Sequence, residues 1–399
     1  MLEINRVTLR DSCVIVASLA TAFYTYKHYK VKQNSKGSKP PKRIDNITEL
    51  IGNTPLVKVA SLSEYTGCNI YAKLELQNPG GSAKDRVALK VIQNAIDKGL
   101  VTPHKKHRDL VFEGTSGSTG ISIALICNAL GLQSFITLPD DTSLEKLKLL
   151  VSYGAHIKKV KPASIVDPEQ YVNSCISSCN AINNDENDDR RGIFVDQFEN
   201  ELNWKVHFET TGPEIYTQMN CQIDCFISGI GTGGTIGGVA RYLKKSQKLY
   251  DLDVCVADPQ GSGFFNRIRH GVMYDHLEKE GSRRRHQVDT LVEGVGLNRI
   301  TKNFGVNEKY IDYAYRIKDK NALQMARWLS NHDGLFLGSS SCINACSVVD
   351  YVREFKLQGS GKNIVFIACD SGSRHLSKFW KEALNIEEAA LINSLDELI

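Results

Sequence analysis

The sequence lacks the cysteine patterns of metal-binding and disulfide-rich proteins. It has eleven cysteines, an odd number, with no Cys-x-x-Cys pair and no histidine companion at zinc-finger spacing. We therefore expect no metal site, and reduced, mostly buried thiols in a reducing compartment. The sequence also shows no internal repeat, no low-complexity domain, no C-terminal regulatory module and no Cys/His arrangement suited to haem ahead of the core.

A strong charge of one sign is lacking as well. The net charge is +4, but residues 1–43 carry nine Lys and Arg against two acidic residues, which leaves −3 for the remainder. We expect no nucleic-acid partner, because a body with this charge does not attract phosphate backbones. The length of 399 residues allows one large α/β catalytic unit or two ordinary domains.

Residues 12–29 are predicted to form a signal anchor in a membrane. Ser12 to Tyr26 is an uncharged run flanked by Arg and Lys residues. As a helix it spans about 22 Å, short of the roughly 30 Å hydrocarbon core. Lys-rich flanks on a short apolar helix suit an anchor in a thin membrane. A secretory signal cleaved after Ala20-Thr21-Ala22 and an amphipathic transit peptide remain as alternatives.

The segments around this anchor complete the domain organisation. A short tail over 1–11 precedes it, and a basic, flexible linker over 30–43 follows. A catalytic domain is expected over 44–385 and an acidic, amphipathic C-terminal helix over 386–399. The expected location is the mitochondrial outer membrane with the catalytic domain facing the cytosol, and the mitochondrial matrix is the alternative.

Short apolar runs alternate with helical patterns throughout the catalytic domain. This alternation indicates an α/β fold with parallel strands and crossover helices. The predicted strands are Ile70 to Leu74, Leu110 to Glu113, Ser134 to Leu138, His156 to Val160, Cys225 to Ile230, Val254 to Asp258 and Ile364 to Ala368.

A glycine-rich loop, Ser228-Gly229-Ile230-Gly231-Thr232-Gly233-Gly234-Thr235, follows one of these strands and opens a helix. Converging backbone N–H groups, a helix N-terminus and two threonine hydroxyls suit a phosphate monoester. No Lys follows, so this is not a Walker loop. The glycines also fit the G-x-G-x-x-G dinucleotide pattern, with Asp253 about 20 residues further on, and this alternative stays open at this point.

A tight turn, Asn78-Pro79-Gly80-Gly81-Ser82-Ala83, places Lys84 at the start of a helix. The helix dipole there disfavours the ammonium and helps the amine stay neutral and nucleophilic toward an aldehyde. An ordinary solvated lysine is the alternative. A phosphate loop in the same chain favours the chemical role, because an aldehyde cofactor with a phosphate needs both.

A third loop, Glu113-Gly114-Thr115-Ser116-Gly117-Ser118-Thr119-Gly120, again joins a strand end to a helix N-terminus. Its hydroxyls and N–H groups suit a substrate α-carboxylate. Helix capping is the alternative reading, and both readings can hold for different residues.

Together these loops resemble the cysteine synthase/cystathionine β-synthase family of fold type II pyridoxal-phosphate (PLP) enzymes, closest to its fungal members with an N-terminal membrane segment. The likeness covers about Ile51 to Ser377. Further matching stretches are Ile51-Gly52-Asn53-Thr54-Pro55-Leu56, Thr142-Ser143-Leu144-Glu145, Thr210-Thr211-Gly212-Pro213-Glu214, Glu293-Gly294-Val295-Gly296 and Ser371-Gly372-Ser373-Arg374-His375-Leu376. The resemblance implies two open, twisted α/β subdomains with the cofactor in the cleft between them, the smaller inserted at about 85–200, and a homodimer.

The resemblance also implies residue roles. Lys84 would carry PLP as a Schiff base and later act as general base. The phosphate would lie on Gly231, Thr232, Gly233, Gly234 and Thr235. The substrate would be held by Thr115, Ser116, Thr119, Gln197 and Gly294.

Two positions depart from the family pattern. Ser118 stands where the family usually has an Asn against the cofactor's ring hydroxyl. Asp370 stands where the family usually has a Ser beside the pyridine nitrogen, although a one-residue slip would give that role to Ser371. A carboxylate at this point would favour a protonated, more electron-withdrawing ring.

The implied reaction is β-elimination through an aminoacrylate followed by addition of a nucleophile. With sulfide and an activated serine such as O-acetylserine, the product is cysteine. The alternative within the class is a cysteine desulfhydrase that releases hydrogen sulfide, pyruvate and ammonia. A NAD-dependent oxidoreductase would leave the Lys84 turn and the Thr115 to Gly120 loop unexplained, and a membrane-tethered pseudoenzyme conflicts with an intact Lys84.

Overall fold

The computed structural model describes residues 43–115, 117–275 and 290–398, and the chain divides into the units Met1–Asp45 and Asn46–Ile399. All described helices and strands lie in the second unit. The predicted tail, membrane segment and nearly all of the predicted linker lie outside the described residues. Within the described ranges, no helix is both long and apolar enough to cross a membrane.

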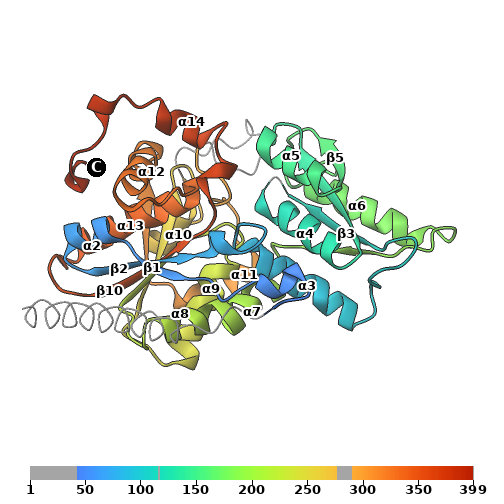
Figure 1. The fold of residues 1–399 in the computed structure, drawn as a ribbon, viewed down its shortest axis with the longest axis horizontal. Helices are drawn as coiled ribbons and strands as arrows, with labels where there is room; N and C mark the ends of the chain where they lie inside the picture. Colours follow the sequence, from blue (N-terminus) through green and yellow to red (C-terminus); the bar gives the residue numbers. More distant parts are fainter. Residues whose placement is uncertain (1–42, 116, 276–289, 399) are drawn as a thin grey trace, which may run out of the picture. The chain divides into compact units, whose positions relative to one another are not determined.

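The larger sheet has six strands in the order β1-β2-β10-β7-β8-β9 (Figure 1). Strand β1 is antiparallel to β2, and the other neighbours are parallel. The strands are β1 (Leu56–Lys58), β2 (Asn69–Leu74), β7 (Cys225–Gly229), β8 (Asp253–Pro259), β9 (Tyr313–Ile317) and β10 (Asn363–Ala368).

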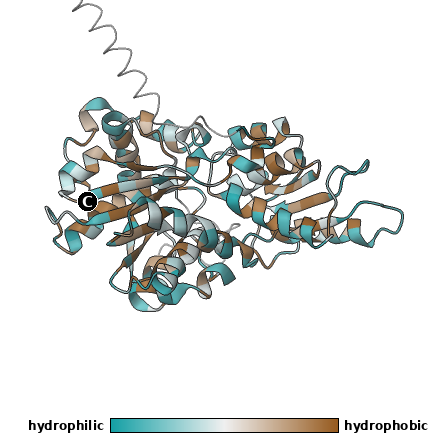
Figure 2. Cartoon of the chain, turned by 60° about the horizontal axis from the view of Figure 1, so that its bottom comes forward, coloured by the Kyte–Doolittle hydropathy of each residue, from teal (hydrophilic) through white to brown (hydrophobic). Residues whose placement is uncertain are grey.

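Helices cover both faces of this sheet, so its strands are buried on both sides. Alternate strand residues, such as Ile364 and Val365, belong to two separate cores. The first core includes α2 (Ala60–Thr66), α12 (Asp319–Asp333), α13 (Ser339–Glu354) and α14 (Phe379–Leu384). The second includes α8 (Gly212–Gln218), α9 (Gly234–Arg241), α10 (Phe264–His270) and α11 (Lys302–Gly305). Figure 2 shows hydrophobic strands inside these helical layers.

The smaller sheet has four parallel strands in the order β5-β4-β3-β6. They are β3 (Leu110–Gly114), β4 (Gln133–Pro139), β5 (His156–Val160) and β6 (Gly192–Phe194). Its hydrophobic core is formed with α3 (Lys84–Asp97), α4 (Ser118–Ala129) and α5 (Leu144–Ser152). Helix α6 (Tyr171–Asn184) contributes Cys175 and Cys179 to a second, smaller core, where they pack with Phe112 of β3.

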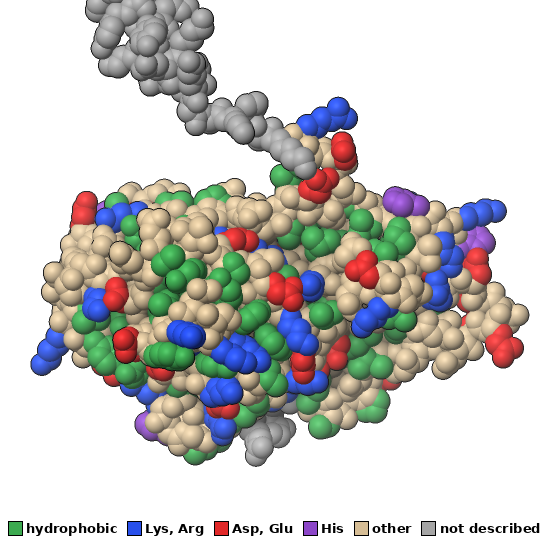
Figure 3. All heavy atoms as spheres, turned by 90° about the horizontal axis from the view of Figure 1, so that it is seen from below, with side chains coloured by type: hydrophobic (Ala, Val, Ile, Leu, Met, Phe, Trp, Pro, Cys, Tyr) green, Lys and Arg blue, Asp and Glu red, His purple; other side chains and the backbone are tan. Residues whose placement is uncertain are grey.

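The remaining elements are short. Two π-helical turns, η3 (His207–Thr211) and η4 (Tyr242–Ser246), follow α7 (Leu202–Val206) and α9. The 3-10 turns are η1 (Ile47–Leu50), η2 (Glu75–Gln77), η5 (Glu308–Tyr310), η6 (Gly372–Arg374), η7 (Glu388–Ala390) and η8 (Leu395–Glu397). On the face seen in Figure 3, Lys and Arg side chains are interspersed with Asp and Glu.

All seven predicted strands are present within a residue or two of their expected bounds, and the α/β fold is confirmed. The sequence did not indicate β1, β6 or β9. The predicted helix over 386–399 is wrong, because the described part of that range holds only η7 and η8. Ser394 caps a new short turn in this segment. Leu395 and Leu398 are buried in the first core, so these two side chains hold the segment in place and a continuous apolar helix face does not.

Candidate active site

A cavity of about 430 Å³ lies where the chain leaves the carboxyl ends of several strands. It is lined by residues that follow β3, β4 and β6 of the smaller sheet and β7 and β10 of the larger one. The carboxyl ends of parallel strands are the usual place for ligands in open α/β sheets. All three predicted loops contribute to its wall.

Lys84 faces this cavity from the first position of α3. The preceding turn depends on its glycines: Gly81 has φ +78°, and a Cβ on Gly80 would lie 2.3 Å from the Asp85 carboxylate. Burial lowers the pKa of the Lys84 ammonium, an effect that the nearby Cys369 and Asp370 oppose without reversing. The neutral, nucleophilic amine predicted from the sequence is therefore favoured at this place.

The glycine-rich loop between β7 and α9 packs so closely that side chains would not fit. A Cβ on Gly231 would lie 2.2 Å from the Gly294 carbonyl oxygen, and one on Gly234 would lie 1.9 Å from Asn203 Oδ1. Gly233 adopts φ +82° beside Phe304. Gly231, Thr232, Gly233 and Thr235 line the cavity, whereas Gly234 is not part of the lining.

Asp253, the partner that the dinucleotide reading requires, lies at the wrong end of the sheet. It pairs with Cys225 at the start of β7, whereas the glycine-rich loop follows Gly229 at the end of that strand. The Asp253 carboxylate accepts a hydrogen bond from the Tyr351 hydroxyl at 2.7 Å. This arrangement leaves the loop without the acidic residue that would bind a dinucleotide ribose.

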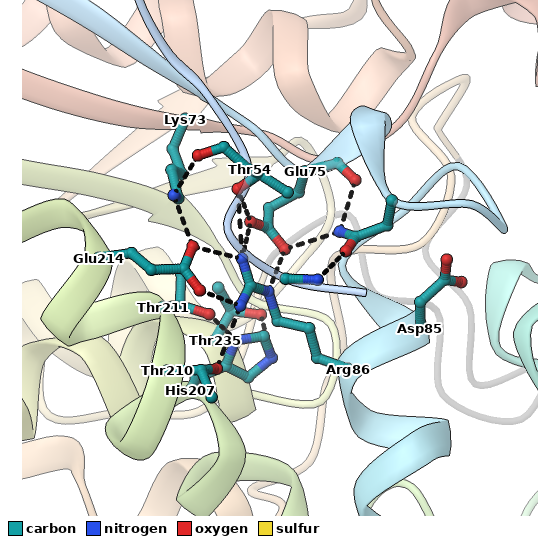
Figure 4. Close-up of polar contacts among 12 residues, drawn as sticks. Thr54, Lys73, Glu75, Asp85, Arg86, His207, Thr210, Thr211, Glu214 and Thr235 are labelled. Atoms are coloured by element: carbon teal, nitrogen blue, oxygen red, sulfur yellow. Dashed lines mark hydrogen bonds and ion pairs between the residues drawn. The ribbon is translucent and has the colours of Figure 1, made fainter. Parts of the chain in front are cut away.

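His207 supports the loop from behind (Figure 4). This fully buried imidazole contacts Thr235 Oγ1 through Nε2 at 3.2 Å and Thr211 Oγ1 through Nδ1 at 2.9 Å. Burial lowers the pKa of His207 to about 3, so the ring is neutral and carries a single N–H. His207 and Thr211 are the first and last residues of the π-helical turn η3, a kind of turn that is frequent at functional sites.

The loop after β3 contributes Thr115, Gly117, Ser118 and Thr119 to the cavity, while Ser116 lies outside the described residues. Thr119 Oγ1 donates to Gln197 Oε1 at 2.6 Å. Both Thr119 and Gln197 line the cavity.

Glu113, just before this loop, was not predicted as a site residue. It is 1% exposed, and burial together with the charge of Asp196 raises the pKa of Glu113 well above its usual range. The sequence signal that could have identified Glu113 is a carboxyl group near the end of an otherwise apolar strand. Tyr171, at the start of α6, lines the cavity and was not predicted either, whereas Glu113 is not part of the lining.

Asp370 follows β10 and lines the cavity, whereas the neighbouring Ser371 does not. The Ser118 hydroxyl donates toward Asp370 Oδ2 at 3.5 Å and accepts from Arg374 Nη1 at 2.9 Å. Asp370 is 7% exposed, and its Oδ1 has no hydrogen-bond partner among the described residues. The two positions that depart from the family pattern therefore lie next to each other.

His375 lies between two carboxylates at the same end of the cavity. Its Nε2 is 3.1 Å from Asp370 Oδ2, and its Nδ1 is 3.1 Å from Glu293 Oε2. Lys146 of α5 pairs with Glu293 Oε2 at 2.6 Å. The sequence motif around Arg374 and Leu376 contained His375 but did not indicate a role for it.

A buried ion-pair network holds the start of α3 against the larger sheet (Figure 4). Arg86 pairs with Glu75 at 2.8 Å and with Glu214 at 2.6 Å, and Lys73 pairs with Glu214 at 2.7 Å. Although burial opposes it, hydrogen bonds and charge from Arg86 and Lys73 lower the pKa of Glu214 to about 2. Thr54 completes the network by donating to Glu75 Oε1 at 2.7 Å.

The structure thus brings most of the predicted site residues to one cavity. These are Lys84, Thr115, Ser118, Thr119, Gln197, Gly231, Thr232, Gly233, Thr235, Gly294 and Asp370. Two family stretches of the sequence, around Thr54 and Glu214, meet in the ion-pair network behind the cavity instead of lining it.

The model of a protein family described as pyridoxal-phosphate dependent enzyme matches residues 47–370. A Saccharomyces cerevisiae protein named "Putative mitochondrial cysteine synthase" is 57% identical over 388 residues, covering 97% of this chain and 95% of that protein. A Schizosaccharomyces pombe protein named cysteine synthase 2 is 49% identical over 359 residues, covering 90% and 88%.

Two solved structures are also similar. A hydrogen sulfide-producing enzyme from Fusobacterium nucleatum has a TM-score of 0.69 and 30% identity, and the alignment covers 84% of this chain and 100% of that one. An O-ureido-L-serine synthase has a TM-score of 0.73 and 24% identity, with coverage of 87% and 97%, and this second likeness concerns the fold alone.

Proposed function

The chain belongs to the family of pyridoxal-phosphate dependent enzymes, and from this membership we propose that it forms cysteine from an activated serine and sulfide. The observation that carries the proposal is that Lys84, the glycine-rich loop and the Thr115 to Thr119 loop line one cavity. An amine, a phosphate site and a carboxylate site are what this reaction needs together. The choice of substrates in this proposal is supported by the relatives that are named cysteine synthases.

The residues of the cavity fit the cofactor. Gly231 and Gly233 lie where a Cβ would collide with the backbone of Gly294 and Phe304, so the loop presents bare backbone to the cavity. Thr232 and Thr235 add hydroxyl donors, and Asn203 Nδ2 holds Thr232 Oγ1 at 2.9 Å. Bare N–H groups with hydroxyls at a helix start suit a phosphate.

Pyridoxal phosphate, when bound, supplies an aldehyde that joins the substrate amine and a conjugated ring that takes up electrons from the α-carbon. In our proposal Lys84 holds the aldehyde end, and the loop from Gly231 to Thr235, with Gly234 supporting it, holds the phosphate. Ser118 and Asp370 face the ring.

The substrate is proposed to bind on the opposite loop. Thr115, Ser116, Thr119 and Gln197 would hold its α-carboxylate, and Gly294 would border it. The bond from Thr119 to Gln197 supports this, because it fixes two polar side chains of the cavity wall relative to each other. A substrate whose carboxylate is fixed in this way has its α-hydrogen in a defined position relative to the base that removes it.

The Lys84 amine is the proposed base for that α-hydrogen. Burial lowers its pKa, which favours the neutral amine that a general base requires. Loss of the proton expels the β-substituent, and sulfide then adds to the β-carbon. Lys84 returns the proton to the α-carbon, and cysteine is released.

Cysteine desulfhydrase activity, which releases hydrogen sulfide, pyruvate and ammonia, is the second candidate. It is favoured by the carboxylate of Asp370 in the cavity wall and by the similar hydrogen sulfide-producing enzyme. Both reactions share the steps up to loss of the β-substituent. They differ in whether sulfide adds before the product leaves.

Purified protein incubated with O-acetylserine and sulfide, with serine and sulfide, and with cysteine alone separates these candidates. We expect cysteine from the first mixture at a rate that exceeds sulfide release from the third. Lys84→Ala should lower both rates by about 10²- to 10⁴-fold and abolish the loss of visible absorbance on borohydride reduction. The exposed Lys98, at the other end of α3, gives a control in Lys98→Ala. Faster sulfide release than cysteine formation would favour the desulfhydrase.

We also propose a mitochondrial location, with residues 12–29 as an outer-membrane anchor and the catalytic domain in the cytosol. The name of the Saccharomyces cerevisiae relative and the uncharged run from Ser12 to Tyr26 support this proposal. Carbonate extraction with protease digestion of intact mitochondria tests it, since a matrix protein would be soluble and protected. Homodimerisation rests on the family resemblance, and light scattering of the purified protein measures it.

A further inference from the structure

Four charged side chains form a line along one end of the cavity. Lys146 of α5 contacts Glu293, Glu293 contacts His375, and His375 contacts Asp370, at distances of 2.6, 3.1 and 3.1 Å. They come from three separate segments of the chain, since Asp370 and His375 both follow β10, and they alternate in charge when His375 is protonated. All four also line the cavity.

Both ring nitrogens of His375 lie 3.1 Å from carboxylate oxygens, which can only accept hydrogen bonds: Nε2 is hydrogen-bonded to Asp370, and Nδ1 is in ion-pair contact with Glu293. Two donors are available only on the imidazolium form. The side chain is 2% exposed, and although burial opposes it, Asp370 and Glu293 raise the pKa of His375 to about 9. Other charged groups nearby are Lys146 and Lys378, which both contact Glu293, and Arg374, whose charge also favours the ionised form of Asp370.

The Asp370–His375 pair is fixed in place by the backbone of Gly338. A Cβ at this position would lie 2.0 Å from Asp370 Oδ1 and 2.7 Å from His375 Nε2. The Gly338 N–H also donates to the Asp370 carbonyl oxygen at 3.0 Å. On the other side, the Ser118 hydroxyl is 3.5 Å from Asp370 Oδ2. The carboxylate therefore has little room to turn away from the cavity.

We propose that His375 is a positioning residue that keeps Asp370 ionised and directed at the ring nitrogen of the bound cofactor. Glu293 and Lys146 hold His375 in the charged form that this requires. The inference rests on the proposed function only in placing the cofactor in this cavity. It adds a residue outside the cofactor and substrate loops that sets how strongly the ring withdraws electrons.

The same line connects α5 of the smaller sheet to the ring end of the site. Glu145, next to Lys146, accepts hydrogen bonds from the backbone N–H and hydroxyl of Ser377 at 2.9 Å. Glu145 thus contacts the segment that carries His375 directly, and Lys146 is linked to it through Glu293. A substitution of Lys146 should therefore alter the position and charge environment of Asp370 through Glu293 and His375.

The test uses the full-length holoenzyme and His375→Gln, in which an amide keeps one donor but no charge. Wild type and variant are reconstituted with pyridoxal phosphate and, separately, with an analogue in which carbon replaces the ring nitrogen. We expect His375→Gln to weaken binding of the natural cofactor about tenfold and to shift its visible absorbance. With the carbon analogue, wild type and variant should bind alike. His332→Gln, on the exposed surface of α12, is the matched control and should change neither.

Equal weakening with both cofactors would overturn the proposal, because it would show a general structural role for His375. An unchanged affinity and spectrum with the natural cofactor would overturn it as well. Lys146→Met provides a second variant away from the ring and should shift the spectrum in the same direction by a smaller amount. Cysteine formation is measured separately, so an enzyme that makes cysteine but shows no His375 effect contradicts this inference alone.

Discussion

Arg86, two residues after Lys84, forms a bidentate ion pair with Glu75 (Figure 4). Its Nε and Nη2 atoms each lie 2.8 Å from a carboxylate oxygen of Glu75. The pair joins α3 to the end of β2. The Nη1 and Nη2 atoms of the same guanidinium donate to the Glu214 carboxylate, so Arg86 connects the first turn of α3 to α8 as well. The position of Lys84 in the cavity depends on this first turn.

Arg86→Met should destabilise the protein strongly. The change leaves the buried Glu75 carboxylate without its main counter-charge, and breaking one side of a buried pair typically costs about 3–5 kcal/mol. Denaturant unfolding measures the loss. Lys90→Met is the control, because Lys90 lies on the same helix but pairs with Glu209 at the surface, and its loss should cost less than about 1 kcal/mol. Equal costs for the two variants would contradict the role of the buried pair.

Gly231→Ala should damage the phosphate site. The added methyl would lie 2.2 Å from the Gly294 carbonyl oxygen, and backbone on both sides must then shift. Overpacking of this kind costs about 1–3 kcal/mol, and we expect cofactor affinity to fall by about tenfold or more for the same reason. Cofactor titration by fluorescence measures this. Gly305→Ala, in an exposed part of α11, is the control, and comparable affinities in the two variants would refute the prediction.

His207 should make the protein sensitive to acid. Its pKa is about 3 in the folded protein, against about 6.5 in an unfolded chain. The stability that comes from keeping it neutral is therefore present above pH 6.5 and is lost progressively as the pH falls toward 3. Over this range the unfolded chain binds one more proton, which corresponds to a slope of about 1.4 kcal/mol per pH unit.

Denaturant unfolding at several pH values tests the His207 prediction. His207→Gln keeps a hydrogen-bonding side chain but cannot titrate, so its stability should fall less steeply between pH 6.5 and 4. The titratable groups near the ring, Glu75, Arg86, Lys84 and Glu214, are the same in both proteins. Parallel stability curves for wild type and variant would show that His207 does not titrate on unfolding.

The sequence predicted the parts of this protein whose signal is local. Strand β10 is an apolar run after Asn363, and the loops at Lys84, Thr115 and Gly231 are defined by residues within a few positions of one another. By contrast, β1 and β6 have only three residues each, too few to show a period of two.

The charged pairs behind the cavity could not be predicted in the same way. Lys73 and Glu214 are 141 residues apart in the chain, and His375 and Glu293 come together only when their segments fold. A partial signal was present, since Lys73 interrupts the apolar strand β2 and a buried lysine needs a partner. Which residue would supply that partner depends on the packing of α8 against the sheet.

Replacing Asp370 by the residue typical of the family should change the balance between elimination and replacement. A carboxylate beside the ring nitrogen favours a protonated ring and a stronger pull on electrons. Asp370→Ser should therefore lower sulfide release from cysteine by about tenfold, while formation of cysteine from O-acetylserine falls less. The ratio of the two rates, measured on one preparation, reports the change.

Ser371→Ala decides whether Asp370 or its neighbour has this role. Ser371 caps the turn η6 and does not line the cavity, so its variant should leave the ratio unchanged. Asp370→Asn should resemble Asp370→Ser in the rates and should also alter the visible absorbance of the cofactor. If Ser371→Ala shifts the ratio and Asp370→Ser does not, the hydroxyl of Ser371 contacts the ring nitrogen, and the site follows the usual family arrangement.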